Sequence, residues 1–130
     1  MAKITSSQIL MGAALVVAIG FVAFAVKTGQ VPSPATAFAQ CLTEKGAKMY
    51  GAWWCPHCTK QKVLFGNAFD KVTYVECSDA TKQMVPLCVS AGIKNYPTWE
   101  FADGSRVTGE QSFAALAQKT GCEVPVVATE

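Results

Sequence analysis

The sequence has few charged residues, a single histidine, and almost as many acidic as basic side chains. Asp, Glu, Lys and Arg make up 15% of its 130 residues, and the formal net charge is +2. Lys3 and Lys27 flank one apolar run, and removing them from the 11 basic residues leaves 9 to match 9 acidic ones. This balance argues against electrostatic binding of nucleic acid. An apolar content of 51% argues equally against a disordered chain.

The segment from Ile9 to Val26 lacks charged and strongly polar residues over 18 positions. As a helix it would span about 27 Å, close to the roughly 30 Å of a bilayer core. It also lacks the polar face that a helix packed on a soluble core shows. We therefore predict a transmembrane helix within an N-terminal membrane anchor, residues 1–27. A cleaved signal segment is the alternative, because Ala37-Phe38-Ala39 resembles a cleavage site.

Six cysteines in so short a chain point to disulfides, a metal site or thiol chemistry. Several disulfides persist mainly outside the cytosol. We therefore place the part of the chain beyond the anchor on the extracytoplasmic side of a membrane, whether in a periplasm, at a cell surface or in a lumen. Beyond the anchor we predict a linker over residues 28–33, a domain over 34–123 and a C-terminal tail over 124–130.

Predicted helices and strands alternate through the domain, and an Asp103-Gly104 hairpin turn joins the last two strands. Strands separated by helices indicate parallel pairing, and the hairpin indicates an antiparallel pair. We therefore predict an α/β fold with a central mixed sheet covered by helices on both faces. The predicted helices are 34–45, 55–65, 81–91 and 111–120, and the predicted strands are 47–51, 72–75, 98–101 and 105–108. Pro86 either interrupts the third of these helices or starts it.

The segment Trp54-Cys55-Pro56-His57-Cys58 lies where a predicted strand meets a helix. Unpaired N–H groups and the dipole at a helix N-terminus favour the thiolate form of Cys55. Cys58, one turn later, faces inward and can attack a mixed disulfide formed at Cys55. Pro56 suits a first turn, where its missing N–H is not needed, and His57 adds a donor or partial positive charge near the sulfurs. Trp54 precedes the pair as a supporting side chain.

A zinc site has the same C-x-x-C spacing and is one alternative for this segment. It needs two more ligands, but His57 is the single histidine and the other cysteines are widely dispersed. A purely structural Cys55–Cys58 disulfide is a second alternative. The strand–loop–helix context favours redox chemistry, so we predict no metal and no cofactor beyond the redox-active disulfide itself. The dispersed cysteines are Cys41, Cys77, Cys88 and Cys122.

Tyr96 and Pro97 precede another predicted strand. A proline there can form a cis peptide bond, leaving the neighbouring backbone free to bind an extended substrate beside Cys55. An ordinary strand-initiating proline is the alternative. Trp53 and Trp54 form either an apolar rim around the reactive sulfur or half-buried loop side chains. The remaining prominent side chains are predicted to belong to the core (Tyr50, Tyr74, Trp99 and Phe101) or to a solvated helix face (Lys60 and Lys62).

The stretches Y-G-A-W-W-C-P-H-C, V-T-Y-V-E-C and G-I-K-N-Y-P-T-W-E-F-A-D-G, followed by a C-terminal helix, resemble the thioredoxin fold. More narrowly, residues 37–122 resemble the thioredoxin-like domain fused to bacterial and plant vitamin K epoxide reductase homologues. The resemblance implies a thiol–disulfide oxidoreductase with Cys55 attacking, Cys58 resolving and Pro97 as the cis-proline. C-P-H-C is also the motif of the DsbA type of oxidase. Met49 is a departure, since thioredoxins have a buried Asp at this position.

Three pairings are possible for the other four cysteines. Cys77 ends a predicted strand and Cys88 lies in the following helix, so a local bridge fits, and the family resemblance also favours it. Cys41–Cys122 then follows by elimination. Buried free thiols are one alternative. A pair that relays electrons between Cys55–Cys58 and a membrane partner is another.

Together these features predict a membrane-tethered extracytoplasmic protein that oxidises protein dithiols through Cys55–Cys58. Its predicted partners are protein thiol or disulfide substrates and, on the resemblance, a quinone-linked membrane oxidase of the vitamin K epoxide reductase or DsbB kind. One alternative is a disulfide reductase or isomerase, for example in cytochrome maturation. A non-enzymatic module that binds metal or a partner protein is the other.

Overall fold

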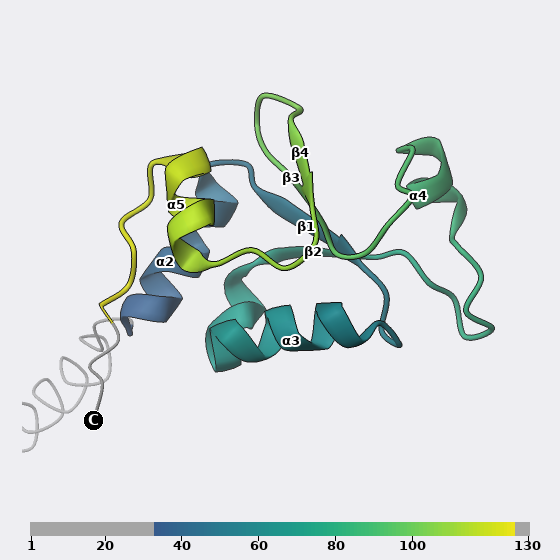
Figure 1. Cartoon of the computed structure of the whole chain (residues 1–130), viewed down its shortest axis with the longest axis horizontal. Helices are drawn as coiled ribbons and strands as arrows, with labels where there is room; N and C mark the ends of the chain where they lie inside the picture. Colours follow the sequence, from purple (N-terminus) through teal and green to yellow (C-terminus); the bar gives the residue numbers. More distant parts are fainter. Residues whose placement is uncertain (1–32, 127–130) are drawn as a thin grey trace, which may run out of the picture. The chain divides into compact units, whose positions relative to one another are not determined.

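The computed structural model describes residues 33–126, which form an α/β unit around one mixed sheet (Figure 1). The four strands lie in the order β2-β1-β3-β4, with β1 parallel to β2 and both remaining pairs antiparallel. The predicted mixed sheet is therefore confirmed. The elements are α2 (Pro34–Glu44), β1 (Lys48–Gly51), α3 (Pro56–Phe65), the 3-10 helix η1 (Gly66–Lys71), β2 (Thr73–Glu76), α4 (Pro86–Ser90), β3 (Thr98–Glu100), β4 (Arg106–Thr108) and α5 (Phe113–Thr120).

Helix α4 starts at Pro86, which is one of the two alternatives that the sequence left open, because residues 81–85 form a turn rather than a first helical turn. The Asp79 carboxylate accepts hydrogen bonds from the backbone N–H groups of Thr81 and Gln83, at 2.8 and 2.9 Å. Lys82 lies in the left-handed region, with φ of 64°. These side-chain-to-backbone bonds stabilise a turn in competition with a helix. The helix begins only at Pro86, which fits the first helical position.

Helices cover both faces of the sheet, as predicted. Met49 and Tyr50 are neighbours on β1, and their side chains point to opposite faces. Met49 packs in the larger core cluster, which α2, α3 and α5 cover and which contains the fully buried Trp99. Tyr50 packs with the Cys77–Cys88 bridge and Ile93 on the face that α4 covers. Figure 1 shows α4 well apart from the other three helices.

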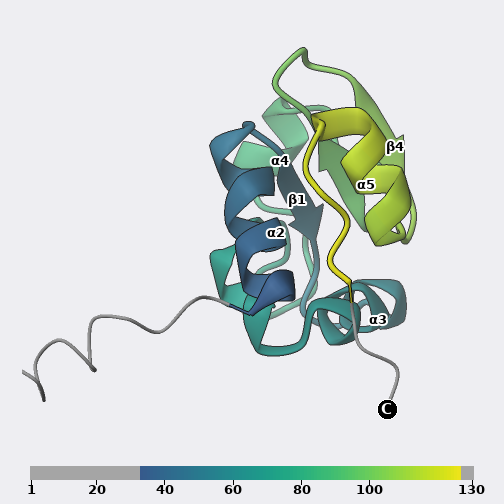
Figure 2. The ribbon, with the colours of Figure 1, turned by 90° about the vertical axis from the view of Figure 1, so that its left-hand side faces the viewer.

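Two disulfides tie the helices to the rest of the domain, in one of the three pairings that the sequence left possible and the one that the family resemblance favours. Cys41 in α2 is bonded to Cys122, and Cys77 after β2 is bonded to Cys88 in α4. The first bond joins residues 81 positions apart in the sequence, the second residues 11 apart. Figure 2 shows the segment that follows α5 running back beside α2.

The predicted anchor, nearly all of the linker and the end of the tail lie outside the described residues. Within residues 33–126, no helix is both long enough and apolar enough to cross a membrane. The Ala37-Phe38-Ala39 motif lies inside α2, where Phe38 and Ala39 are buried in the core. Cleavage after Ala39 would therefore remove the first half of a core helix.

Glu100 on β3 forms ion pairs with side chains from both neighbouring strands. Its carboxylate lies 2.9 Å from the Nζ of Lys48 and accepts a 2.7 Å hydrogen bond from the Nε of Arg106. Burial alone would raise the pKa of Glu100, but the hydrogen bonds from Lys48 and Arg106 outweigh it and lower the pKa below its ordinary value.

A lowered pKa in the folded protein means that Glu100 stabilises the fold above the ordinary carboxyl pKa, and that this contribution is lost as the pH falls through the lower, folded value. We expect Glu100→Gln to cost about 1 kcal/mol at neutral pH. Denaturant unfolding at neutral and acidic pH measures the difference, which should shrink in acid. A cost that stayed constant with pH would contradict an electrostatic origin.

Candidate active site

Cys55 is the N-cap of α3, directly after the loop that leaves β1. The loop turns sharply, since the Cys55 N–H donates to the carbonyl of Ala52 at 3.0 Å. Pro56 takes the first helical position, as predicted, and the Thr59 N–H donates to the Cys55 carbonyl at 3.1 Å. Cys55 and Cys58 are both free thiols, exposed by 6% and 1%. Cys55 is therefore the more accessible of the two sulfurs.

The Cys55 sulfur faces the segment that precedes β3. Its Sγ lies 3.8 Å from the carbonyl oxygen of Tyr96, to which the thiol donates a hydrogen bond. The Tyr96–Pro97 peptide bond is cis, and Pro97 is buried. Trp54 stacks edge-on against Tyr96 with ring centroids 6.2 Å apart. The structure thus brings Trp54 and Cys55 together with Tyr96 and Pro97, although the two pairs lie more than 40 positions apart in the sequence.

Cys58 lies beneath Cys55, against the end of β1. A Cβ atom added at Gly51 would lie 3.0 Å from the Cys58 sulfur, so only glycine leaves room for it there. Burial is the main cause that raises the pKa of Cys58, to about 12. The neighbouring Cys55 thiol raises it further, while the Ala52 backbone and the charge of Lys62 oppose the shift. Cys58 is therefore a protonated thiol at neutral pH.

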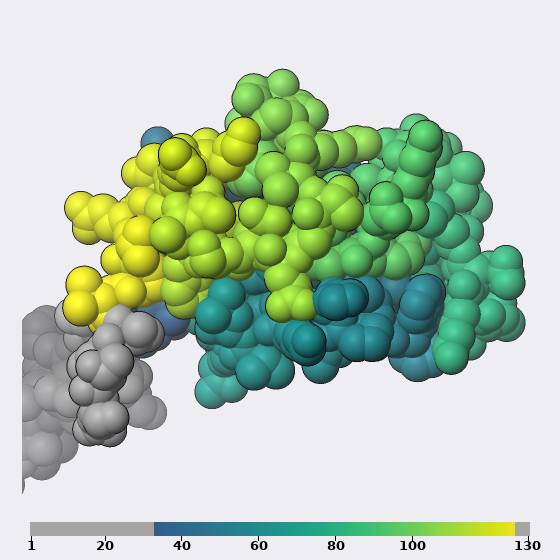
Figure 3. Space-filling model, viewed as in Figure 1, coloured from purple at the N-terminus to yellow at the C-terminus, as the bar shows by residue number. Residues whose placement is uncertain are grey.

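The His57 side chain contacts Glu110, in the segment before α5. Its side chain is 63% exposed, and its Nδ1 lies 2.7 Å from a carboxylate oxygen of Glu110. None of the contacts described for residues 33–126 joins the ring to a sulfur. Beside it, Gln61 binds both backbone groups of Gln111. Figure 3 shows the segment before α5, in yellow-green, lying directly against α3 in blue-teal.

Trp53 and Trp54 form an exposed aromatic rim beside Cys55, with side chains that are 53% and 40% exposed. The Nε1 of Trp53 donates to the Asp79 carbonyl at 3.1 Å, and the Nε1 of Trp54 donates to the Ser78 hydroxyl at 2.7 Å. These bonds fix both rings by their polar ends and leave their apolar surfaces to solvent. These exposures fit both interpretations, an apolar rim beside the sulfur and half-buried loop side chains.

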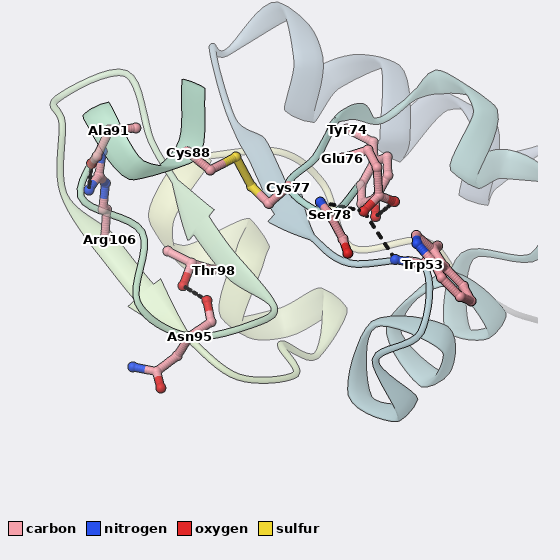
Figure 4. The surroundings of a disulfide bond; sticks show 10 residues. All are labelled: Trp53, Tyr74, Glu76, Cys77, Ser78, Cys88, Ala91, Asn95, Thr98 and Arg106. Carbon is pink, nitrogen blue, oxygen red and sulfur yellow. Dashed lines mark hydrogen bonds between the residues drawn. A yellow bond between two sulfur atoms is a disulfide. The ribbon is translucent and has the colours of Figure 1, made fainter. Parts of the chain in front are cut away.

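Sequence reasoning missed a polar cluster made by Tyr74, Glu76 and Lys62. The Tyr74 hydroxyl donates to Glu76 Oε2 at 2.8 Å, while Glu76 Oε1 accepts from the backbone N–H groups of Trp53 and Ser78, at 3.1 and 3.0 Å. Figure 4 shows these groups converging on the carboxylate. Lys62 is not simply solvated, since its Nζ lies 3.8 Å from the centroid of the Tyr74 ring.

A signal for this cluster is present in the sequence. Glu76 ends a strand that is parallel to β1, and it pairs in register with Gly51, just before the C-x-x-C loop. The carboxyl ends of parallel strands meet at one edge of a sheet. Tyr74, predicted to be a core residue, is only partly buried, whereas Tyr50, Trp99 and Phe101 are buried as predicted.

The remaining cysteines offer no further thiols near the site, because all four are engaged in the two disulfides. Across residues 33–126, no cluster of three or more His, Cys, Asp and Glu side chains is arranged to hold a metal ion. The site holds two free thiols, both buried, of which Cys55 is the more exposed.

The fold and the site together define an α/β domain that presents a C-x-x-C dithiol at the start of a helix. Over 92 residues the chain is 44% identical to the thiol-disulfide oxidoreductase LTO1 of Arabidopsis thaliana. The match covers 67% of this chain but 24% of that protein, so the chain spans about a quarter of the relative's length. No protein-family model matches the chain.

Proposed function

We propose that the protein is a thiol–disulfide oxidoreductase of the thioredoxin fold, in which Cys55 attacks and Cys58 resolves. The observation that carries this proposal is the pairing of an N-cap thiol, Cys55, with a buried thiol one turn later on the same helix. Helix N-terminal N–H groups stabilise a thiolate at the first position. The similarity to a protein named thiol-disulfide oxidoreductase supports the same chemistry.

The proposal includes Tyr96 and Pro97 as the backbone that binds an extended substrate. The Tyr96 carbonyl is already a hydrogen-bond acceptor for the Cys55 thiol, so a substrate sulfur at Cys55 would lie beside it. The exposed rings of Trp53 and Trp54 provide apolar contact area for an unfolded substrate chain at the same place.

The direction we propose is oxidation of protein dithiols, followed by reoxidation by a quinone-linked membrane enzyme of the vitamin K epoxide reductase or DsbB kind. The DsbA-like C-P-H-C motif supports the direction, and the apolar run Ile9–Val26 supports a membrane tether with the domain on the extracytoplasmic side. The reduction potential distinguishes the two directions, since strong oxidants of this chemistry lie near about −120 mV and reductants near about −270 mV.

Trapping tests the proposal. We expect Cys58→Ala to accumulate mixed disulfides between Cys55 and its protein partners, because no second thiol remains to release them. Non-reducing electrophoresis followed by mass spectrometry identifies the partners, and a membrane oxidase should be among them. Cys55→Ala is the matched control and should trap nothing. Equal trapping by both variants, or by neither, would contradict the assignment of Cys55 as the attacking thiol.

A further inference from the structure

The resolving thiol must lose its proton, and its surroundings make this difficult. Cys58 is 1% exposed, and burial holds its pKa near 12. On the strand beneath it, Met49 is fully buried and apolar, so β1 supplies no carboxylate to accept the proton. Because only the thiolate attacks a disulfide, a proton acceptor has to come from another element.

Tyr74 on β2 is the polar side chain that the structure places beside Cys58. A Cβ at Gly51 would lie 3.0 Å from the Cys58 sulfur and 3.1 Å from the Tyr74 hydroxyl oxygen. Since both distances start from one point, the sulfur and the hydroxyl are at most about 6 Å apart. At most one water molecule fits between two polar atoms at this separation.

The Tyr74 hydroxyl is hydrogen-bonded to the carboxylate of Glu76. It donates to Glu76 Oε2 at 2.8 Å, and two backbone N–H groups hold Glu76 Oε1 in place (Figure 4). Burial, and then the hydrogen bond to Glu76, raise the pKa of Tyr74 above its ordinary value. The phenol therefore stays protonated and can pass a proton on without itself becoming a lasting anion.

We propose that Tyr74 and Glu76 form the proton-transfer route for Cys58, with Glu76 as the final acceptor inside the protein. This inference rests on the proposed function, because it assigns the proton of the resolving step. The charged and titratable groups around the route are Lys62 over the Tyr74 ring, Cys55 on α3 and Tyr96 on the facing segment.

The step balances as follows in the resolving direction. The Cys58 sulfur bonds to the Cys55 sulfur, the bond between Cys55 and the substrate sulfur breaks, and the substrate leaves as a thiolate that takes a proton from solvent. The Cys58 proton passes to the Tyr74 oxygen, directly or through one water, as the Tyr74 proton passes to Glu76. Glu76 then releases a proton to solvent. When a substrate thiolate opens the Cys55–Cys58 disulfide, the proton travels back to Cys58.

The test uses the reduced full chain and an aromatic disulfide reagent, dithiobis(nitrobenzoate), whose coloured thiol reports each step. The first release follows attack by Cys55 and depends on reagent concentration, whereas the second follows resolution by Cys58 and does not. The other four cysteines are paired and do not react. We expect Tyr74→Phe and Glu76→Gln each to slow the second release about tenfold near neutral pH. The first release should keep its wild-type rate.

The pH profile distinguishes proton transfer from a structural effect. The difference from wild type should disappear in alkaline solution, where hydroxide removes the Cys58 proton. Tyr50→Phe is the matched control, because it removes a hydroxyl from the other face of the sheet, and it should leave both releases unchanged. A wild-type second release in both Tyr74→Phe and Glu76→Gln, or slowing that is the same at every pH, overturns the route. If the wild-type protein gave no first release, Cys55 would not be the attacking thiol, and the proposed function itself would be overturned.

Discussion

Replacing Cys55 with Ser is expected to slow disulfide exchange with a dithiol peptide by at least about a thousandfold, to the uncatalysed background. Without the Cys55 sulfur, the Cys55–Cys58 disulfide that the peptide thiolate attacks cannot form. Cys58 cannot substitute for it, because that sulfur is buried and its pKa is about 12. Following peptide oxidation by fluorescence, after wild type and variant have been treated with the same oxidant, measures the loss.

Cys58→Ser is the matched control for this loss. It should also stop turnover, but Cys55 should still react with an alkylating reagent as fast as in the wild-type protein, because the environment at the helix N-terminus is intact. If Cys55→Ser kept even a tenth of the wild-type exchange rate, the reactive sulfur would lie elsewhere, and the two disulfides would be the places to look.

Removing the Cys41–Cys122 disulfide is expected to cost about 4 to 5 kcal/mol of unfolding free energy, on a chain-entropy estimate. The bond closes a loop of 81 positions and ties α2 to the segment after α5. Without it, the unfolded chain gains the freedom of nearly the whole domain. Guanidinium unfolding of Cys41→Ala combined with Cys122→Ala measures the change.

The double variant Cys77→Ala with Cys88→Ala is the comparison, because its loop is only 11 positions long. Here the same estimate is about 3 kcal/mol. Which of the two disulfides costs more unfolding free energy to remove is a sharper test of the loop-length argument than either value alone. The reverse order would show that packing of the buried Cys77 and Cys88 on the α4 face outweighs loop closure.

Local signals explain why most of the fold could be predicted. Pro34 and Pro56 occupy the first positions of helices, where their missing N–H groups are not needed. Gly66 and Gly121 follow helix ends and have positive φ angles, which glycine adopts without strain. The sequence left open whether Pro86 interrupts or starts its helix. The choice between turn and helix before Pro86 depends on hydrogen bonds that the Asp79 carboxylate accepts, which no periodicity reveals.

The candidate site was predictable as far as it is local in sequence. Cys55 and Cys58 are one helical turn apart at the start of a predicted helix, so the spacing together with the strand–loop–helix context predicts a dithiol site. The partner of His57 depends instead on tertiary packing. Glu110 lies 53 positions from His57, and nothing in the local pattern of either residue indicates their contact. Tyr74 and Glu76 are two positions apart on one strand, so their side chains share a face, whereas the contact between Tyr74 and Lys62 is tertiary.

The placement of the two ends of the described domain has a consequence for access. Residue 33 precedes α2, and the segment after α5 returns beside α2 through the Cys41–Cys122 bond. The N-terminal end of α3, with Cys55, lies at the opposite side (Figure 1). Within residues 33–126, neither end of the described domain therefore lies beside the two thiols.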